Sequence, residues 1–257
     1  MAASTTSVPP QRGRFDWPWR GGPSFVTPDG SQVSLGGAAL DTTRPWSALF
    51  AALVHGTRRA FTVAEAGAFD WHSTYTMIPD EIRRYPYRGG ELLLGTRHPQ
   101  TGDEPGDYRA AWRGQWFELH TCGSGAAPAA DRLIRIFDAF RLTDTPLGML
   151  AAPRSVRQAR MEPFQVAKQI PGLGFLTIER PEHGRIGVPD FRGHPTEHGE
   201  LWREPLGIGA HGRARPDALL LATPTAVTRL VAGPSDSADP NEVLALLAGL
   251  NVIWEPA

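Results

Sequence analysis

The stretch YRAAWRGQWFELHT (residues 108–121) decides the expected fold, because it predicts two short strands joined by a turn at residues 113–114. In its second half, side chains of two kinds alternate with the period of two that is typical of a β-strand. One face carries Phe117, Leu119 and Thr121, and the other carries Trp116, Glu118 and His120. We therefore expect an antiparallel hairpin with one half-exposed face.

Outward from this hairpin, the pattern changes to the period of a helix. A helix is predicted from Pro128 to Arg141, and another is predicted after residues 239–242, where Asp, Pro and Glu occupy capping positions. A second hairpin is predicted at 24–35, around a Pro-Asp-Gly turn.

Three further segments carry less regular patterns. We expect a helix that begins near Asp41 and buries Trp46, Leu49, Phe50 and Leu53, and a short strand at Thr74–Ile78. Residues 183–216 show no periodicity and are expected to form a long irregular loop.

Strands and helices do not alternate regularly enough for a doubly wound parallel sheet. The predicted fold is α+β, with mostly antiparallel sheet and a few amphipathic helices. A strand, a helix and an apolar segment follow one another in both 115–150 and 219–254, which suggests two similar lobes. We expect a disordered tail at 1–12 and lobes at 13–150 and 151–257, with one continuous domain as the alternative.

The composition excludes several classes of function. The 257 residues have a formal net charge of −1, which argues against general nucleic-acid binding. Lys168 is the only lysine, and it follows no Gly-rich loop, so lysine-dependent chemistry is disfavoured. Use of arginine in place of lysine is typical of a high-GC bacterial genome. The single cysteine, the lack of an apolar leader segment and the lack of a long apolar run predict a soluble cytoplasmic protein without a membrane partner.

The segment between the predicted strand and helix, LHTCGSG (residues 119–125), is the first candidate site. Cys122 could be a nucleophile with His120 as its base, in a small-molecule hydrolase or transferase. The alternative is a plain connection with a buried thiol. A small anionic ligand is a further hypothesis, for which the candidate anion-binding residues are Gly123, Ser124, Gly125, Arg213 and Arg215.

The segment HPTEH (residues 194–198) matches the H-x-x-E-H pattern of some zinc hydrolases. The candidate metal ligands are His194, Glu197 and His198, although neighbouring glycine and proline interrupt the helix that this chemistry needs. We expect no cofactor, with zinc at this segment as the alternative to a solvated loop. The sequence GIGAHG (residues 207–212) precedes a proline in place of a helix, so it does not predict a dinucleotide site.

Carboxylates, Glu118 among them, are scattered over predicted loops and strands, and we expect most of them to be solvated. Aromatic residues gather near the start of the chain, at Phe15, Trp17 and Trp19. They could bind a partner or pack on the protein's own core. With no specific catalytic motif, the sequence favours a protein that acts by protein–protein contact, in an adaptor, assembly or immunity-type role, and leaves enzymatic activity undecided.

Overall fold

The computed structural model describes residues 22–37, 45–98, 106–170, 174–204, 218–232 and 240–257. Of these residues, 55% lie in strands and 16% in helices. The strand pairings within each part of the chain are antiparallel. The protein therefore consists mostly of antiparallel sheet with few helices.

The chain divides into two compact units. The first contains Ala48–Pro163, and the second contains Phe164–Ala257 together with the described part of Trp19–Ser47. The change of unit falls at residues 163–164, beyond the expected position near 150, because one long strand, β11 (Ala159–Ile170), carries the chain across it. The hairpin at 24–36 belongs to the second unit.

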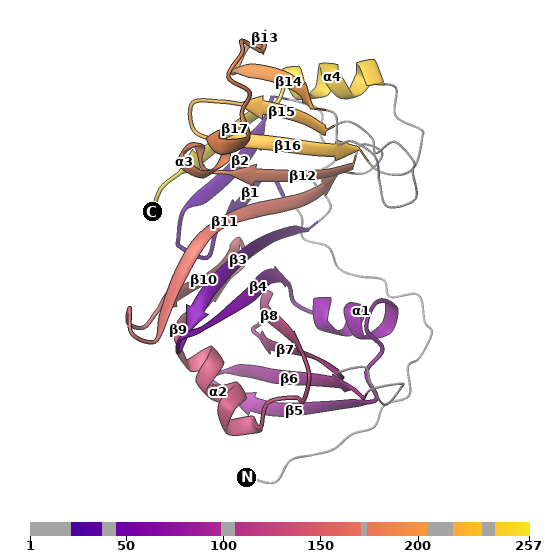
Figure 1. Ribbon diagram of the computed structural model, residues 1–257, viewed down its shortest axis with the longest axis vertical. Coiled ribbons are helices and arrows are strands. Elements are labelled where there is room, and N and C mark those ends of the chain that lie inside the picture. The colour runs from indigo at the N-terminus through magenta and orange to yellow at the C-terminus, as the bar shows by residue number, and fades with distance from the viewer. Residues whose placement is uncertain (1–21, 38–44, 99–105, 171–173, 205–217, 233–239) are drawn as a thin grey trace. The chain divides into compact units, whose positions relative to one another are not determined.

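The first unit is built around one sheet. In chain order its strands are β3 (Trp46–Val54, from Ala48 onward in this unit), β4 (Thr57–Glu65), β5 (Glu81–Tyr87), β6 (Gly90–Arg97), β7 (Asp107–Arg113), β8 (Phe117–Ser124), β9 (Phe140–Thr145) and β10 (Gly148–Pro153). Helix α1 (Ala68–Tyr75) connects β4 to β5, and α2 (Ala130–Asp138) connects β8 to β9. The sheet order is β3-β4-β8-β7-β6-β5, and β9 and β10 form a separate hairpin (Figure 1).

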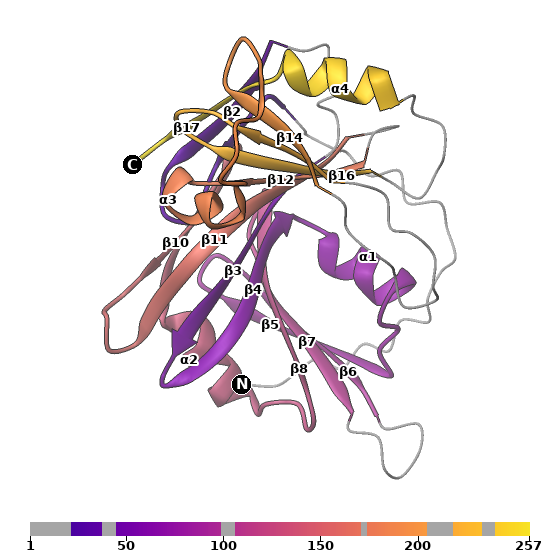
Figure 2. The same cartoon turned by 45° about the horizontal axis from the view of Figure 1, so that its top comes forward.

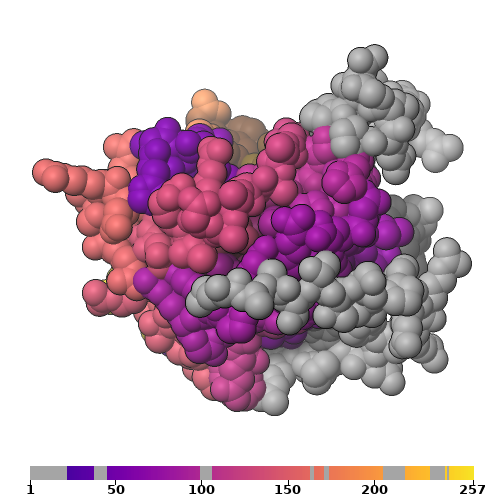
Figure 3. All heavy atoms as spheres, turned by 90° about the horizontal axis from the view of Figure 1, so that it is seen from below, coloured from indigo at the N-terminus to yellow at the C-terminus, as the bar shows by residue number. Residues whose placement is uncertain are grey.

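Side chains from other elements pack against both faces of this sheet. On one face, α1 lies across the strands, and its Phe69 packs with Leu93 of β6 and Ala111 of β7 (Figure 2). On the other face, Phe140 of β9 contacts the rings of Phe50 and Phe61. Atoms of this unit, coloured violet to rose, fill much of the view in Figure 3.

The second unit contains β11 from Phe164, β12 (Gly174–Glu179), β13 (His194–Pro195), β14 (Glu200–Glu204), β15 (Ala218–Ala222) and β16 (Val227–Ala232). Helix α3 (Pro181–Gly184) and the 3-10 turn η1 (Arg185–Gly187) connect β12 to β13, and α4 (Pro240–Ala248) precedes β17 (Asn251–Glu255). The order of this sheet is β11-β12-β16-β15-β14-β13. Strand β17 pairs with β2 (Gln32–Gly36), which pairs with β1 (Ser24–Val26).

The sheets of the two units have the same strand order. In each unit, two strands, a helical segment, four strands and a helix follow one another along the chain; β9 and β10 come after the helix in the first unit, whereas β17 alone follows it in the second, which also contains β1 and β2. In each sheet, the first two strands are followed in space by the sixth, fifth, fourth and third.

The predicted hairpins and two of the predicted helices are confirmed. Strands β1 and β2 flank a turn in which Gly30 has a φ of 91°, and β7 and β8 flank the turn after Arg113. The helices predicted after Pro128 and Asp239 are α2 and α4.

The helix predicted at the segment WSALFAALV (residues 46–54) is wrong, because this segment is strand β3. Its burial alternates strictly, with Trp46, Ala48, Phe50, Ala52 and Val54 inward. Apolar residues occupy both faces of the segment, so periods of 2 and 3.6 fit it equally well. Pairing with β4 decides between them.

Three other expectations are also wrong. The strand predicted at Thr74–Ile78 overlaps the end of α1, and the loop expected at 183–216 holds parts of α3, η1, β13 and β14 among its described residues. The polar face of β8, expected to be half-exposed, is buried at Glu118 and His120, because α1 covers it. In each case the observed structure depends on contacts with residues that lie far away in the sequence, which a local pattern does not show.

Replacement of Phe140 by alanine should lower the free energy of unfolding by about 3–5 kcal/mol. The ring is fully buried, with centroids 5.2 Å from Phe61 and 6.3 Å from Phe50, so truncation leaves a cavity. Urea unfolding measures the change. Leu147→Ala, at a side chain that is 54% exposed, is the matched control and should cost less than about 0.5 kcal/mol. Equal losses in the two variants would contradict this packing.

Candidate functional site

Glu118 on β8 is the centre of the polar interior of the first unit. The residue is fully buried, and its carboxylate accepts the backbone N–H groups of Gly67 (2.5 Å) and Phe69 (2.8 Å) at the start of α1. The first N–H groups of a helix have no partner within the helix, and they favour a negative charge. A side chain of the sheet therefore supplies the anion that the N-terminus of α1 needs.

Two basic side chains complete the surroundings of this carboxylate. Arg113, its cross-strand partner on β7, donates Nε–H to Oε1 of Glu118. The Nε2 atom of His120 lies 2.9 Å from Oε2. Burial alone would raise the pKa of Glu118, but His120, Arg113 and the Gly67 N–H together hold this pKa below its ordinary value. Glu118 is therefore ionised at neutral pH.

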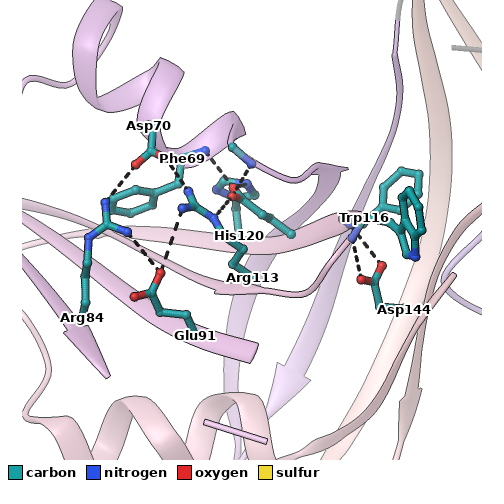
Figure 4. Close-up of polar contacts among 11 residues, drawn as sticks. Phe69, Asp70, Arg84, Glu91, Arg113, Trp116, His120 and Asp144 are labelled. Atoms are coloured by element: carbon teal, nitrogen blue, oxygen red, sulfur yellow. Dashed lines mark hydrogen bonds and ion pairs between the residues drawn. The ribbon is translucent and has the colours of Figure 1, made fainter. Parts of the chain in front are cut away.

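Charged side chains extend this network to the outer surface of α1. Asp70 on α1 lies between Arg84 on β5, at 3.2 Å, and Arg113, at 2.9 Å (Figure 4). Arg84 also lies 3.1 Å from Glu91 on β6. Helix α1 is thus attached by ion pairs to β5 and β7 and by hydrogen bonds to Glu118 on β8, in addition to the packing of Phe69. We name Glu118, Arg113, Asp70, Arg84 and Glu91 the α1 anchor.

A second, half-buried carboxylate fixes the turn that precedes β8. Asp144 on β9 accepts the N–H groups of Trp116 (2.7 Å) and Phe117 (3.1 Å), as Figure 4 shows for Trp116. Partial burial raises the pKa of Asp144, and these N–H groups oppose that rise. The start of β8, and with it Glu118, is held in one register.

His72 lies on α1 beside this network. Its ring is 6.1 Å from the ring of His120, and its Nδ1 is 3.1 Å from the Oγ1 of Thr76. Burial, followed by the nearby charges of Arg109 and His120, lowers the pKa of His72 to about 4. The imidazole is therefore neutral at physiological pH.

The predicted thiol site lies at the edge of the same face. Cys122 is exposed, and the alternative of a buried thiol is wrong. Strand periodicity places Cys122 on the same side of β8 as His120, with Arg109 directly across on β7. However, Nε2 of the buried His120 lies within ion-pair distance of Glu118. A catalytic role for the pair stays a prediction.

The predicted anion loop has a different local structure from the one expected. Gly123 and Ser124 are the last residues of β8, and Gly125, with a φ of 93°, donates its N–H to the carbonyl of Gly106. Residues 126–129 separate this glycine from the first residue of α2. Arg213 and Arg215 lie outside the described residues, so binding of an anion there stays a prediction.

The predicted metal ligands do not lie on a helix. His194 is in β13, and Glu197 and His198 lie in the turn that leads to β14, where the Thr196 N–H donates to the Gly199 carbonyl. In the described part of the chain, no three His, Cys, Asp or Glu side chains are grouped closely enough to share a metal ion. Nothing in these residues favours the metal-dependent alternative.

The predicted partner-binding residues Phe15, Trp17 and Trp19 lie outside the described residues. Instead, the structure shows exposed apolar side chains on and after α1: Trp71, Tyr75 and Ile78. Lys168, the only lysine, is buried in β11, with its Nζ 4.6 Å from the ring centroid of Trp46. The amine is therefore not available for Schiff-base chemistry.

The α1 anchor was not predicted from the sequence, and Glu118, which belongs to the carboxylates of which most were expected to be solvated, is fully buried. The available signal was the spacing of Arg113 and Glu118, which the predicted turn places opposite each other on neighbouring strands. An acidic and a basic residue at that spacing are typical of a cross-strand ion pair, whether exposed or buried. Burial itself depends on α1, which no local pattern places there.

Comparisons with family models, with curated proteins and with solved structures find no match for this chain. Within the described residues, no helix has the length and apolar character needed to cross a bilayer.

Replacement of Glu118 by glutamine should reduce the free energy of unfolding by about 3–5 kcal/mol, because it removes the charge of a fully buried carboxylate and leaves half-buried Arg113 with an incomplete set of partners. Urea unfolding measures the loss, and hydrogen exchange should show faster exchange of the Gly67 and Phe69 amides. Glu81→Gln removes a surface ion pair with Arg83 and should cost less than about 1 kcal/mol. A Glu118 variant no weaker than this control would refute the anchoring role.

Replacement of His72 by glutamine should flatten the dependence of stability on pH between 6.5 and 4. In this range the unfolded chain gains a proton at His72 that the folded chain does not take up, so the wild type loses stability as the pH falls. Thermal unfolding across the range, with the exposed His194→Gln variant as control, measures the slope. Parallel curves for wild type and His72→Gln would show that the histidine does not contribute.

Proposed function

We propose that this protein is a non-catalytic adaptor or assembly factor that binds a protein partner through its α1 surface, defined as Trp71, Tyr75 and Ile78. An immunity-type role, in which the partner is neutralised by binding, uses the same contact. The observation that carries the proposal is the exposure of two large aromatic rings on a helix that is itself rigidly held.

The α1 surface is apolar and open to solvent. Trp71 is 39% exposed, Tyr75 is 54% exposed and Ile78 is 58% exposed. The two rings are one helical turn apart, with centroids separated by 5.6 Å. Exposure of neighbouring aromatic rings is costly in water, and Trp and Tyr are enriched among the residues that dominate binding energy at interfaces.

The α1 anchor gives this surface a fixed position before any partner binds. Glu118 holds the N-terminus of α1, and Asp70, next to Trp71, is held by Arg84 and Arg113. A preorganised surface loses little conformational entropy on binding. The proposal thus gives the buried charge of Glu118 and its partners a role, which is to present α1 to a partner.

The topology supports a further part of the proposal, namely that the two units are similar lobes derived from one repeated unit with amphipathic helices. Buried positions recur at a constant spacing around α2 and α4. They are Leu133, Phe137 and Phe140 in the first unit and Val243, Leu247 and Leu250 in the second. In the second unit, the connection that corresponds to α1 also exposes apolar side chains, with Ile186 91% and Phe191 65% exposed.

The expected compartment is the cytoplasm. The single, exposed thiol, which needs no disulfide partner, supports this expectation. A small-molecule hydrolase or transferase at Cys122 is the alternative, favoured by the exposure of the thiol opposite Arg109. We prefer the adaptor for two reasons. His120, the base that the enzyme would need, lies within ion-pair distance of Glu118. The side chains of the α1 surface, in contrast, are exposed and therefore accessible to a partner.

The decisive variant is Trp71→Ala combined with Tyr75→Ala in the full-length chain. Loss of two aromatic anchors should weaken partner binding more than about tenfold. Affinity purification from the native host, with quantitative mass spectrometry, should show the same partner with wild type and its loss with this variant. The matched control is Leu147→Ala with Val156→Ala, at side chains 54% and 86% exposed outside α1, which should retain the partner. A wild-type protein that purifies alone, or a partner kept by both variants, counts against the proposal.

A further inference from the structure

A small hollow in the first unit is lined by basic side chains and by none of the residues of the α1 surface. It lies between the turn of the β3–β4 hairpin and the exposed side of α2, and its volume is about 200 Å³. Val54 and Ile136 supply apolar walls. The polar lining consists of His55, Thr57, Arg59, Arg132 and Arg135.

The hairpin side of this hollow is rigid. His55 and Gly56 form a two-residue turn in which both have positive φ values, 46° and 80°. Positive φ at both positions defines the tight turn that matches the twist of paired strands. The backbone N–H of His55 also donates to the carbonyl of Gln158 at 2.9 Å, so the turn is held from outside the hairpin as well.

The helix side is tied to the same turn. Nε2 of His55 lies 3.2 Å from the backbone carbonyl of Arg135 on α2. A carbonyl oxygen only accepts, so Nε2 carries the proton in this hydrogen bond, and Nδ1 is left for another contact. His55 therefore closes one end of the hollow and fixes the distance between hairpin and helix.

The charge in the hollow is only partly neutralised. Asp131 lies 3.0 Å from Arg135, and the neutral Tyr108 hydroxyl accepts a hydrogen bond from Arg59 at 2.9 Å. For Arg132, the described residues supply no carboxylate within ion-pair distance. Two guanidinium groups, those of Arg59 and Arg132, thus lack an opposite charge in this part of the chain.

We propose that this hollow binds a phosphate group, either as free phosphate or as a small phosphate monoester. Planar guanidinium groups donate paired hydrogen bonds to two oxygens of a phosphate, and two of them match its double negative charge. The volume suits such a group and is below the range of roughly 300–1,000 Å³ for larger organic ligands. This site is separate from the α1 surface, and neither proposal depends on the other.

Isothermal titration calorimetry on the full-length protein tests this site, with sodium phosphate and glycerol 3-phosphate as probes and sodium chloride at matched ionic strength as the blank. We expect saturable binding with a dissociation constant of about 1 mM or lower. Tighter binding of orthophosphate would identify free phosphate as the ligand, and tighter binding of the ester would identify a monoester.

Arg132→Gln, at an exposed position that should not affect folding, should weaken binding at least about tenfold, because it removes a charged hydrogen-bond donor. Arg185→Gln, at an exposed arginine in the other unit, changes the net charge equally and should leave binding unchanged. Absence of saturable binding to either probe would overturn the proposal. An equal loss in both variants would overturn it as well, because it would show attraction to the net charge alone.

Discussion

A buried carboxylate holds a helix to a sheet in the first unit, and the exposed surface of that helix depends on it. Glu118 replaces the water that would otherwise satisfy the first N–H groups of α1, and Arg113 and His120 stabilise its charge in the interior. Buried ion pairs contribute little net stability, because desolvation offsets their attraction, but removal of one partner is costly. Their main consequence here is positional, since they hold α1 in the orientation in which Asp70 reaches both Arg84 and Arg113.

Much of the sheet could be predicted from the sequence where one face of a strand is apolar and the turn is explicit. The hairpins around Gly30 and Gly114 and the helices α2 and α4 carry such local signals. Segment 46–54 does not, because apolar side chains occupy both of its faces and only pairing with β4 selects a strand. Helix α1 was missed for a related reason. Its N-terminal cap is Gly67 without a capping side chain, and the cap comes from Glu118 more than fifty residues away in the chain.

The candidate site could be predicted less well than the fold, because its contacts are almost all non-local. Cys122 was found by residue type, and its exposure agrees with an accessible thiol, but the pattern could not show that His120 lies within ion-pair distance of a buried carboxylate. Trp71 and Tyr75 are adjacent on any helix, yet which side of α1 faces solvent is set by Phe69 on the opposite side. The basic hollow likewise combines a turn with a helix that lies far along the chain.

On the proposal that the two units are repeats, the second unit shows what the same scaffold does without the buried carboxylate. Glu65 pairs with Phe117, the residue before Glu118, and Glu179 pairs with Val227, the residue before Thr228. The strand registers therefore place Thr228 of β16 at the position that corresponds to Glu118. Thr228 is fully buried, and its hydroxyl has no hydrogen-bond partner among the described residues. The connection in that unit forms only the four-residue α3 and the turn η1, whereas α1 has eight residues. A threonine cannot supply the charge that the helix N-terminus favours. The longer helix, which carries the aromatic side chains, therefore occurs in the unit whose sheet carries the carboxylate.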